Sequence, residues 1–315
     1  METLSGGAVT FCVAWKAVIQ MGITVRKAVL SDVEFIAMAY RSDNPYVDRF
    51  LQSGLDTPEN LYRLGGVWMH RDSCAEHLSI FRRYGGEIFV AELDRRVVGH
   101  IEVIVDANRN VGEYAYISVL MVHRDYRRKG VGRKLVEAAI DYAREKGQNK
   151  ILVAAEEQSV GFYKKLGFVA EEEWLSVYVP RQRSRIMPTT IKKEEALDEI
   201  LRNRYDPVLG KFHGTRMILF EFVAQYATLR KLDIHHFFFR MPTEDTSVII
   251  GIRKSKDIPN VAWAWCDREA NRTRILRWIA GIIHNLGIPK ILTAIPKQDT
   301  NLEIVERITW MKKEI

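Results

Sequence analysis

Arg127-Arg128-Lys129-Gly130-Val131-Gly132 separates an apolar run from a helical repeat of apolar residues. This order predicts a strand, a turn and the start of a helix. The unpaired N–H groups of a first helical turn and the positive end of the helix dipole both favour an anion. Glycines at 130 and 132 keep Cβ atoms away from it, and Arg133 adds charge to the basic residues of the turn. The stretch therefore predicts an open loop that binds a diphosphate.

Apolar periodicity and turn residues on either side of this loop predict an alternation of strands and helices. The predicted strands are residues 23–29, 88–93, 97–105, 114–122, 151–155 and 174–179. The predicted helices follow Ser31-Asp32 and cover residues 57–64, 72–84, 131–143 and 160–166.

The chain has 315 residues, of which 47% are apolar, so two domains are expected. The arginine-containing stretch between Pro180 and Pro188 has little apolar content and marks the boundary. We predict an N-terminal extension at 1–21, a first domain at 22–180, a linker at 181–187 and a second domain at 188–315.

The second domain repeats the pattern of the first at a shift of 140 residues. Leu135 falls on Ile275, and the stretch 150–152 falls on the identical stretch 290–292. The loop does not repeat, because Ala270 and Arg272 replace its glycines, and Asp267 replaces Arg127. The second copy is therefore expected to fold without holding the same ligand.

Composition narrows the class of protein without selecting one. The net charge of +7 suits nucleic acid, a membrane surface or a phosphorylated cofactor equally. Three scattered cysteines predict no disulfide framework or metal site, and they indicate a cytoplasmic protein. The apolar stretch 8–23 is shorter than the ~20 residues that span a bilayer, so no membrane segment is expected.

The strand Tyr116–Val122, the turn Arg127-x-x-Gly130-x-Gly132 and the later stretch Gly161–Phe168 together resemble the GNAT N-acetyltransferase superfamily. The resemblance covers residues 22–180. It implies an α/β (α+β) fold in which helices flank a mixed, mostly antiparallel sheet. Because the second domain keeps the apolar register of the first but not its loop, we expect a degenerate copy without cofactor that packs against the first domain and forms a wall of the acceptor cleft.

The resemblance further implies acetyl-CoA as cosubstrate and a primary amine as acceptor. In this family two parallel strands, here 114–122 and 151–155, separate at a bulge to admit pantetheine. The resemblance assigns the pantetheine contacts to the backbone of Leu120, Met121 and Val122. It assigns the diphosphate to the backbone amides of Arg128, Lys129, Gly130, Val131, Gly132 and Arg133. A neutral amine then attacks the thioester directly, without an acyl-enzyme.

Tyr163 occupies the position of the family's general acid. The ordinary pKa of tyrosine is ~10 and that of a thiol is ~8.5, so a tyrosine is protonated at neutral pH and can donate to a developing thiolate. The structural alternative is an aromatic side chain that only packs beside Phe162.

The amine must lose a proton, and Glu113 is our first candidate for the base. Glu102, Tyr116, Glu156 and Glu157 are further candidates, and a solvated carboxylate is the alternative for each glutamate. Glu156 also stands where many family members have an asparagine, so the polar contact expected there is in doubt.

The identity of the acceptor is not encoded in an obvious motif. Residues 43–86 are expected to shape its site, and a small amine, an amino acid, a protein N-terminus and a lysine side chain all remain open. A non-catalytic acyl-CoA-binding module and a nucleic-acid-binding protein are the alternative functions, and a homodimer is left open.

Overall fold

The computed structural model describes residues 22–108, 111–185, 187–203, 205–210, 226–243, 246–268, 270–297 and 300–315. The predicted extension at 1–21 lies outside these residues. The strands are β1 (Thr24–Lys27), β2 (Gly86–Leu93), β3 (Arg96–Asn108), β4 (Gly112–Val122), β5 (Lys150–Glu156), β6 (Val169–Pro180), β7 (Thr189–Ile191), β8 (Asp206–Leu209), β9 (Ile234–Met241), β10 (Val248–Ser255), β11 (Val261–Cys266), β12 (Lys290–Pro296) and β13 (Glu303–Glu314).

The α-helices are α1 (Val33–Arg41), α2 (Val47–Gln52), α3 (Pro58–Gly65), α4 (Arg71–Arg83), α5 (Val131–Glu145), α6 (Val160–Lys165), α7 (Lys193–Arg202) and α9 (Arg272–Asn285). Short 3-10 helices are η1 (Leu30–Asp32), η2 (Val67–Met69), η3 (Arg124–Tyr126), η4 (Glu157–Ser159) and η5 (Ala227–Leu229). None of the helices in the described part of the chain has the length and apolar content to cross a membrane.

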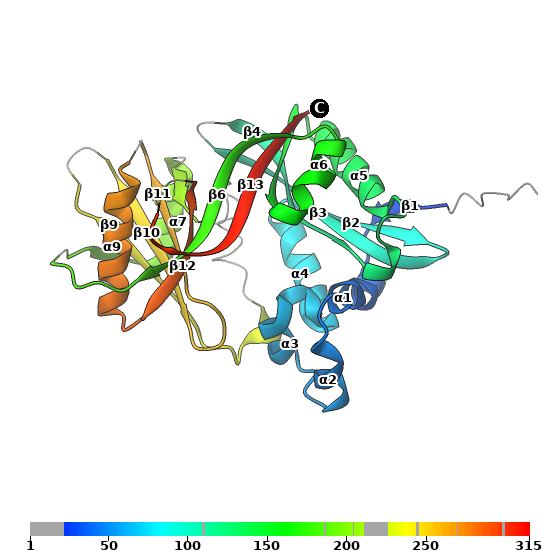
Figure 1. Cartoon of the computed structure of the whole chain (residues 1–315), viewed down its shortest axis with the longest axis horizontal. Helices are drawn as coiled ribbons and strands as arrows, with labels where there is room; N and C mark the ends of the chain where they lie inside the picture. The colour runs from blue at the N-terminus through cyan, green and yellow to red at the C-terminus, as the bar shows by residue number, and fades with distance from the viewer. Residues whose placement is uncertain are drawn as a thin grey trace, which may run out of the picture.

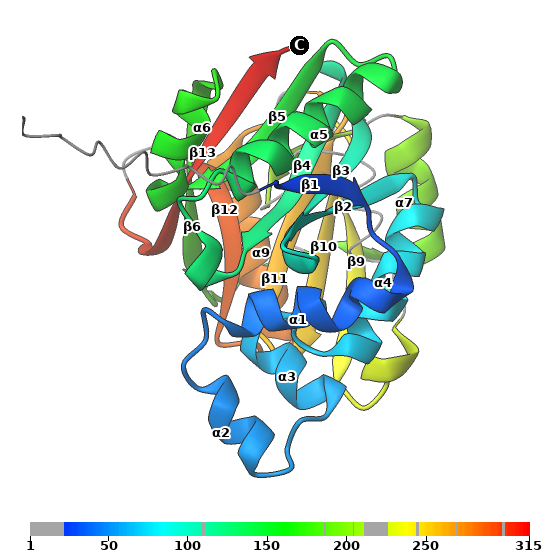
Figure 2. The same ribbon diagram turned by 90° about the vertical axis from the view of Figure 1, so that its right-hand side faces the viewer.

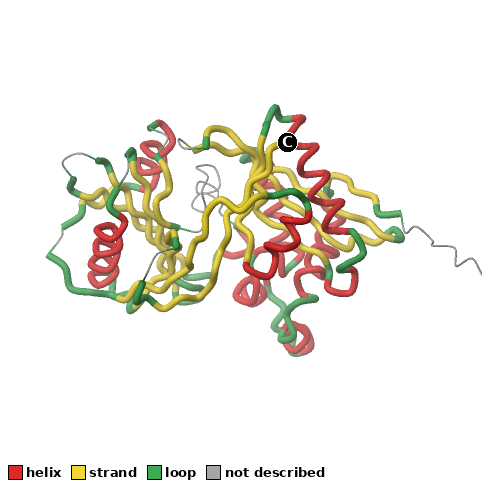
Figure 3. Tube along the Cα trace, turned by 45° about the horizontal axis from the view of Figure 1, so that its top comes forward, coloured by secondary structure: helices red, strands yellow, loops and turns green. Residues whose placement is uncertain are grey.

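The thirteen strands of the described residues form one continuous sheet (Figure 3). Their order is β1-β2-β3-β4-β5-β13-β6-β12-β11-β10-β9-β7, and β8 pairs with β11. Only β4–β5 and β11–β12 are parallel pairs, and every other described pair is antiparallel. Helices cover both faces, so the predicted fold class, a mixed and mostly antiparallel sheet flanked by helices, is confirmed.

The two long strands β6 and β13 lie side by side and connect the two parts of the molecule (Figure 1). We call residues 22–180 the first half and residues 188–315 the second half. β13 belongs to the second half in sequence, yet it pairs with β5, while β6 pairs with β12. The sheet thus exchanges one strand between the halves, and Trp310 of β13 packs against Tyr116 of β4.

Alternating side chains of the sheet build separate cores on its two faces. In the first half, Ala115 and Ile117 face α5 and α6, whereas Tyr114 and Tyr116 face α1 and α4. Figure 2 shows α5 and α6 on one side of these strands and α1 with α4 below them. The second half repeats the arrangement with α9 on one face and α7 on the other.

The predicted elements are present with shifted ends, and β6 shows why. It begins at Val169, five residues before the predicted start, through three consecutive glutamates that carry no apolar alternation. Partners on distant strands stabilise this part, since Lys312 of β13 pairs with Glu171 at 2.5 Å, and Lys297 pairs with Glu173. α2 has no counterpart among the predicted helices. The expected strand–helix–strand unit of the second half is present as β11, α9 and β12.

Candidate functional site

The parallel pair β4–β5 separates at a bulge in β4. Ile117 lies opposite Val103 and Val119 lies opposite Glu102, so Ser118 is the additional residue on β4. The parallel register with β5 ends at Ile117 and Val153, although both strands continue. We call the separated ends, residues 118–122 and 154–156, the first V.

Three consecutive residues of the first V, Leu120, Met121 and Val122, are half-buried and pair with β3 along one edge only. Within the described residues, β4 has β3 and β5 as its neighbours in the sheet, and β5 is paired only up to Ile117. Backbone groups of an unpaired edge can pair with an extended amide chain, as in strand addition. This is the backbone that the sequence assigns to pantetheine.

The turn after β4 presents its backbone to solvent. Arg127, Arg128, Lys129 and Gly130 are exposed, and the next residue, Val131, is buried and fixes the start of α5. Arg128 and Gly130 have left-handed φ values of 60° and 89°. No side chain caps the N-terminus of α5 at Gly130. Left-handed residues beside unpaired N–H groups form an anion-binding concavity.

The side chain of Arg127 stabilises the turn through contacts with two neighbouring segments of the chain. Its Nε donates to the backbone oxygen of Val122 at 3.0 Å, and its Nη2 pairs with Asp43 from the segment after α1. The turn is therefore attached both to the end of β4 and to the helices that precede β2.

Gly132 is required for packing as well as for access. A Cβ at Gly132 would lie 3.3 Å from the ring of Phe162 in α6, which is closer than most Cβ contacts. The sequence had suggested only that this glycine admits a ligand. The structure shows that it also lets α5 approach the helix that carries Tyr163.

Tyr163 lies in α6 and is 5% exposed. Its ring packs edge-on against Phe162 and Phe168, with centroid separations of 5.1 and 5.3 Å. Burial, and secondarily the charge of Glu156, raises the pKa of Tyr163 well above its ordinary value. Burial and the nearby Tyr163 likewise raise the pKa of Tyr116. Both hydroxyls are therefore neutral at neutral pH, and they lie close enough to affect each other.

Glu113 lies away from the first V. It is exposed at the beginning of β4, the end of the strand opposite the turn. Glu156 and Glu157 are exposed at the other end of β5. Glu113 therefore lies at the end of β4 that is remote from the separated strands, whereas Glu156 lies at the end of the first V.

A different carboxylate lies directly behind the bulge. Glu102 is 1% exposed and accepts hydrogen bonds from Trp68 Nε1 at 2.6 Å, His77 Nε2 at 2.9 Å and Ser118 Oγ at 3.2 Å. His77 Nδ1 lies 2.9 Å from the hydroxyl of Tyr226, a residue of the second half. The sequence named Glu102 as a lesser candidate, but no local spacing connects it with partners so far along the chain.

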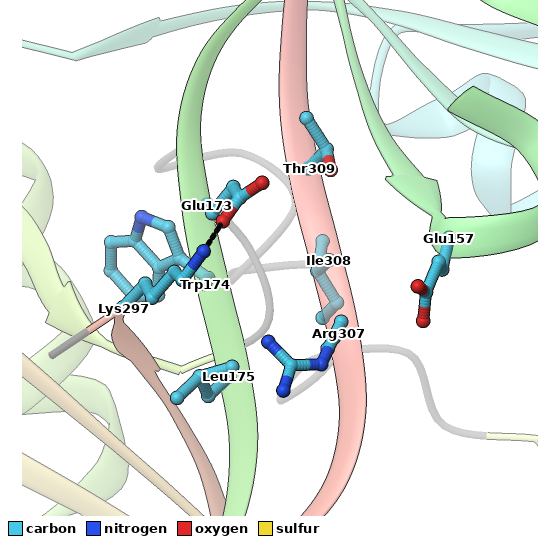
Figure 4. Close-up of a pocket in the computed structure, with 8 residues that line it drawn as sticks. All are labelled: Glu157, Glu173, Trp174, Leu175, Lys297, Arg307, Ile308 and Thr309. Carbon is cyan, nitrogen blue, oxygen red and sulfur yellow. Dashed lines mark hydrogen bonds and ion pairs between the residues drawn. The ribbon is translucent and has the colours of Figure 1, made fainter. Parts of the chain in front are cut away.

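Figure 4 shows a pocket of ≈ 250 Å³ at the junction of the halves. β6 and β13 form most of its wall, Glu157 faces it from η4, and Lys297 pairs with Glu173 at its edge. Its lining residues are Glu157, Glu173, Trp174, Leu175, Lys297, Arg307, Ile308 and Thr309. The pocket adjoins the β5 arm of the first V, because its lining residues Ile308 and Thr309 pair with Glu156 and Ala155.

Comparisons with known proteins agree with this geometry. The family described as Acetyltransferase (GNAT) family matches residues 55–168. N-alpha-acetyltransferase 30 of Schizosaccharomyces pombe is 31% identical over 83 residues, which cover 25% of this chain and 55% of that protein. The chain therefore spans only about half the length of this relative.

Glucosamine 6-phosphate N-acetyltransferase of Trypanosoma brucei brucei is 30% identical over 101 residues, covering 30% of this chain and 69% of that protein. Among solved structures, a tandem GNAT protein from the clavulanic acid biosynthesis pathway aligns with 93% of this chain and 98% of its own. Its TM-score is 0.53 at 14% identity, so the likeness concerns the fold alone.

Proposed function

Because the chain belongs to the GNAT acetyltransferase family, we propose that it moves an acetyl group from acetyl-CoA to a primary amine by direct attack within a ternary complex. The observation that carries the proposal is the first V, which leads into a turn with exposed amides at an uncapped helix N-terminus. The strand edge can pair with an extended amide chain, and the turn next to it can bind an anion. Acetyl-CoA carries these two groups, pantetheine and a diphosphate, next to each other.

Each proposed residue acts through a group that the fold positions. The amides of Arg128, Lys129, Gly130, Val131, Gly132 and Arg133 would hold the diphosphate. The backbone of Leu120, Met121 and Val122 would pair with pantetheine, and the exposed basic side chains of the turn would add positive charge.

Tyr163 would protonate the leaving thiolate. Its burial keeps the hydroxyl neutral at neutral pH, so a proton is available when the C–S bond breaks. Glu113, the base that the sequence predicts, is exposed at the far end of β4 and has no direct access to the reacting groups, so this proposal leaves the base unassigned.

The acceptor is proposed only by class. One relative is named for a phosphorylated amino sugar and another for protein α-amines, so both types belong in a test panel. The cytoplasmic location and the homodimer that the sequence left open stay predictions.

The direct test measures thiol release from acetyl-CoA with glucosamine 6-phosphate, a peptide with a free α-amine, a peptide with only a lysine amine, and a polyamine. We expect amine-dependent thiol release together with a product about 42 Da heavier, because an acetyl group replaces a hydrogen. A protein that binds acetyl-CoA but releases no thiol with any amine would be a binding module instead.

A further inference from the structure

The hydrogen bonds around Glu102 all point toward its carboxylate. An ionised carboxylate only accepts, so the donors are Trp68 Nε1–H, His77 Nε2–H and Ser118 Oγ–H. His77 therefore carries a hydrogen on Nε2, and its Nδ1 lies within hydrogen-bond distance of the hydroxyl of Tyr226. Burying a carboxylate is costly unless donors surround it in this way.

The charge of Glu102 is maintained by its surroundings. Burial acts to raise its pKa, but the neighbouring His77, by charge and hydrogen bond, lowers the pKa below the ordinary value. The other titratable groups that face it are Tyr40 of α1, Cys74 of α4 and His100 of β3, whose Nε2 lies 3.8 Å from Glu102 Oε1. Burial raises the pKa of Tyr40 and Cys74, so both stay neutral.

Ser118 connects this carboxylate with the first V. It is the bulged residue of β4 and lies where the parallel pairing with β5 ends. Its hydrogen points to Glu102, so the lone pairs of its Oγ remain available to another donor. Four residues of strand, roughly 13 Å, separate Ser118 from Val122 beside the turn. This spacing places Ser118 at the thioester end of a pantetheine that extends back from the diphosphate.

We propose that Ser118 and Glu102 together accept the proton of the attacking amine, Ser118 as a catalytic residue and Glu102 as the group that acts through it. This inference rests on the proposed acetyl transfer. The amine N–H donates to Ser118 Oγ, and the polarised hydroxyl becomes a better acceptor because its own proton is shared with an anion.

The proton transfers balance. One proton of the ammonium group first moves to Ser118 Oγ while the Ser118 proton moves to Glu102 Oε2. The neutral amine nitrogen then bonds to the acetyl carbon as the C–S bond breaks. The thiolate takes the proton of Tyr163. The new amide nitrogen passes its excess proton to the Tyr163 phenolate. Glu102 alone is left neutral, and it returns to its ionised state by proton exchange with water after the products leave.

The second half supplies a positioning residue to this arrangement. The hydroxyl of Tyr226 orients the ring of His77 through Nδ1. Glu76 of α4 holds the segment that follows, because it accepts from the backbone N–H of Thr228 at 3.0 Å and from its hydroxyl at 2.8 Å. Tyr226→Phe should therefore reduce turnover less than a change at Glu102, because it removes only the bond that orients His77.

The test compares Glu102→Gln and Ser118→Ala with Glu113→Gln as the matched control on an exposed carboxylate. Using the amine that gives turnover with the wild-type protein, we expect either change at Glu102 or Ser118 to lower kcat about 100-fold or more at pH 7, in the range of general-base catalysis. Acetyl-CoA affinity should be nearly unchanged. The loss should shrink as pH rises toward the pKa of the amine, because a neutral amine needs no base. Glu113→Gln should behave like the wild type.

The outcomes separate the two proposals. If the wild-type protein releases no thiol with any amine, the proposed function fails. If it turns over and both variants retain wild-type kcat, or lose the same factor at every pH, the proton-accepting role is wrong. If Glu102→Gln does not fold, Ser118→Ala decides, because this half-buried hydroxyl contributes little packing; thermal unfolding and acetyl-CoA binding report the folded state.

Discussion

The two parallel strand pairs, β4–β5 and β11–β12, have the same arrangement but differ in whether another strand pairs with their separated ends. In the first V, pairing of β4 with β5 ends at Ile117, and Leu120 to Val122 are half-buried. In the second half, the parallel register of β11 and β12 is the single pair Val261–Leu292, and β8 pairs with β11 at Ala264 to Cys266. β10 occupies the other edge of β11, so β8 lies on the edge that leaves β12.

The N-termini of α5 and α9 also differ in whether a side chain caps their backbone N–H groups. Asn271 caps α9, because its side chain accepts from the backbone N–H of Arg274 at 3.0 Å. Gly130 offers α5 no such cap. Backbone groups require hydrogen-bond partners, and the second half supplies them from its own chain. Within the described residues, the first V is suited to a ligand because its strand edge and helix N-terminus leave backbone groups unpaired, whereas β8 and Asn271 pair the corresponding groups of the second half.

The largest effect is expected from Tyr163→Phe, because this change removes the proposed general acid from the half of the molecule that we propose to be catalytic. The packing against Phe162 and Phe168 is kept, so acetyl-CoA affinity should be nearly unchanged. Turnover in the thiol-release assay should fall about 100- to 10,000-fold, the usual range for a general acid. Tyr178→Phe, a change on β6 away from the first V, is the control and should leave turnover intact. Unchanged turnover in Tyr163→Phe would remove this residue from the mechanism.

The second test asks whether the halves are energetically separable. Trp310 lies on the last strand but packs against Tyr116 and Trp174 of the first half, and it is 4% exposed. Trp310→Ala should lower the free energy of unfolding by about 3–5 kcal/mol, as for other buried large-to-small changes. Val305→Ala, on an exposed residue of the same strand, should have little effect.

Denaturant unfolding followed by both far-UV circular dichroism and tryptophan fluorescence is the measurement. We expect one transition in the wild-type protein, with both probes coincident, since β6 and β13 are exchanged between the halves. Two well-separated transitions, with acetyl-CoA binding retained after the first, would show that the shared strands do not couple the halves.

The first V could be predicted largely from sequence because its signals are local. Strand, glycine turn and helix follow one another within residues 114–143, and each element has its own apolar period. The repeat also predicted the unit β11, α9 and β12, since the helix keeps its apolar face in register at the same shift.

The remaining features depend on contacts between distant residues. The exposed glutamates at the start of β6 become a strand only because β13 pairs with them. The cluster at Glu102 joins residues of η2, α4, β4 and the second half, and no spacing reveals it. The place of β8 beside β11 follows from register, since its residues, Asp206-Pro207-Val208-Leu209, form no recognisable motif.

The third test introduces a negative charge into the turn before α5, and we expect a smaller effect, on acetyl-CoA affinity. Gly130→Asp places a carboxylate where we propose the diphosphate, and aspartate tolerates the left-handed φ of this position better than most residues. Acetyl-CoA affinity, measured by calorimetry, should fall about 10- to 100-fold through like-charge repulsion. Ala270→Asp is the matched change in front of α9 and should leave the affinity unaltered. Equal losses in both variants would mean that the two helix N-termini do not differ in the proposed way.

The smallest effect concerns a buried titratable group that β3 carries beside the first V. His100 is fully buried, its ring nitrogens have no hydrogen-bond partner among the described residues, and burial lowers its pKa to about 4. Below its ordinary pKa of 6.5 the unfolded chain binds a proton that the folded chain does not, so stability must fall as pH drops from 6.5 toward 4. The slope is at most about 1.4 kcal/mol per pH unit for one proton.

His100→Phe should remove this contribution while keeping the ring volume, and its stability at pH 7 should match or exceed that of the wild type. The slope should be reduced rather than abolished, because His236 of β9, whose pKa burial also lowers to about 4, titrates in the same range. Phe89→Leu, a change at a buried ring that cannot titrate, is the control and should keep the full slope. An unchanged slope in His100→Phe would mean that His100 is protonated alike in the folded and unfolded chains, and that water reaches its buried position on β3.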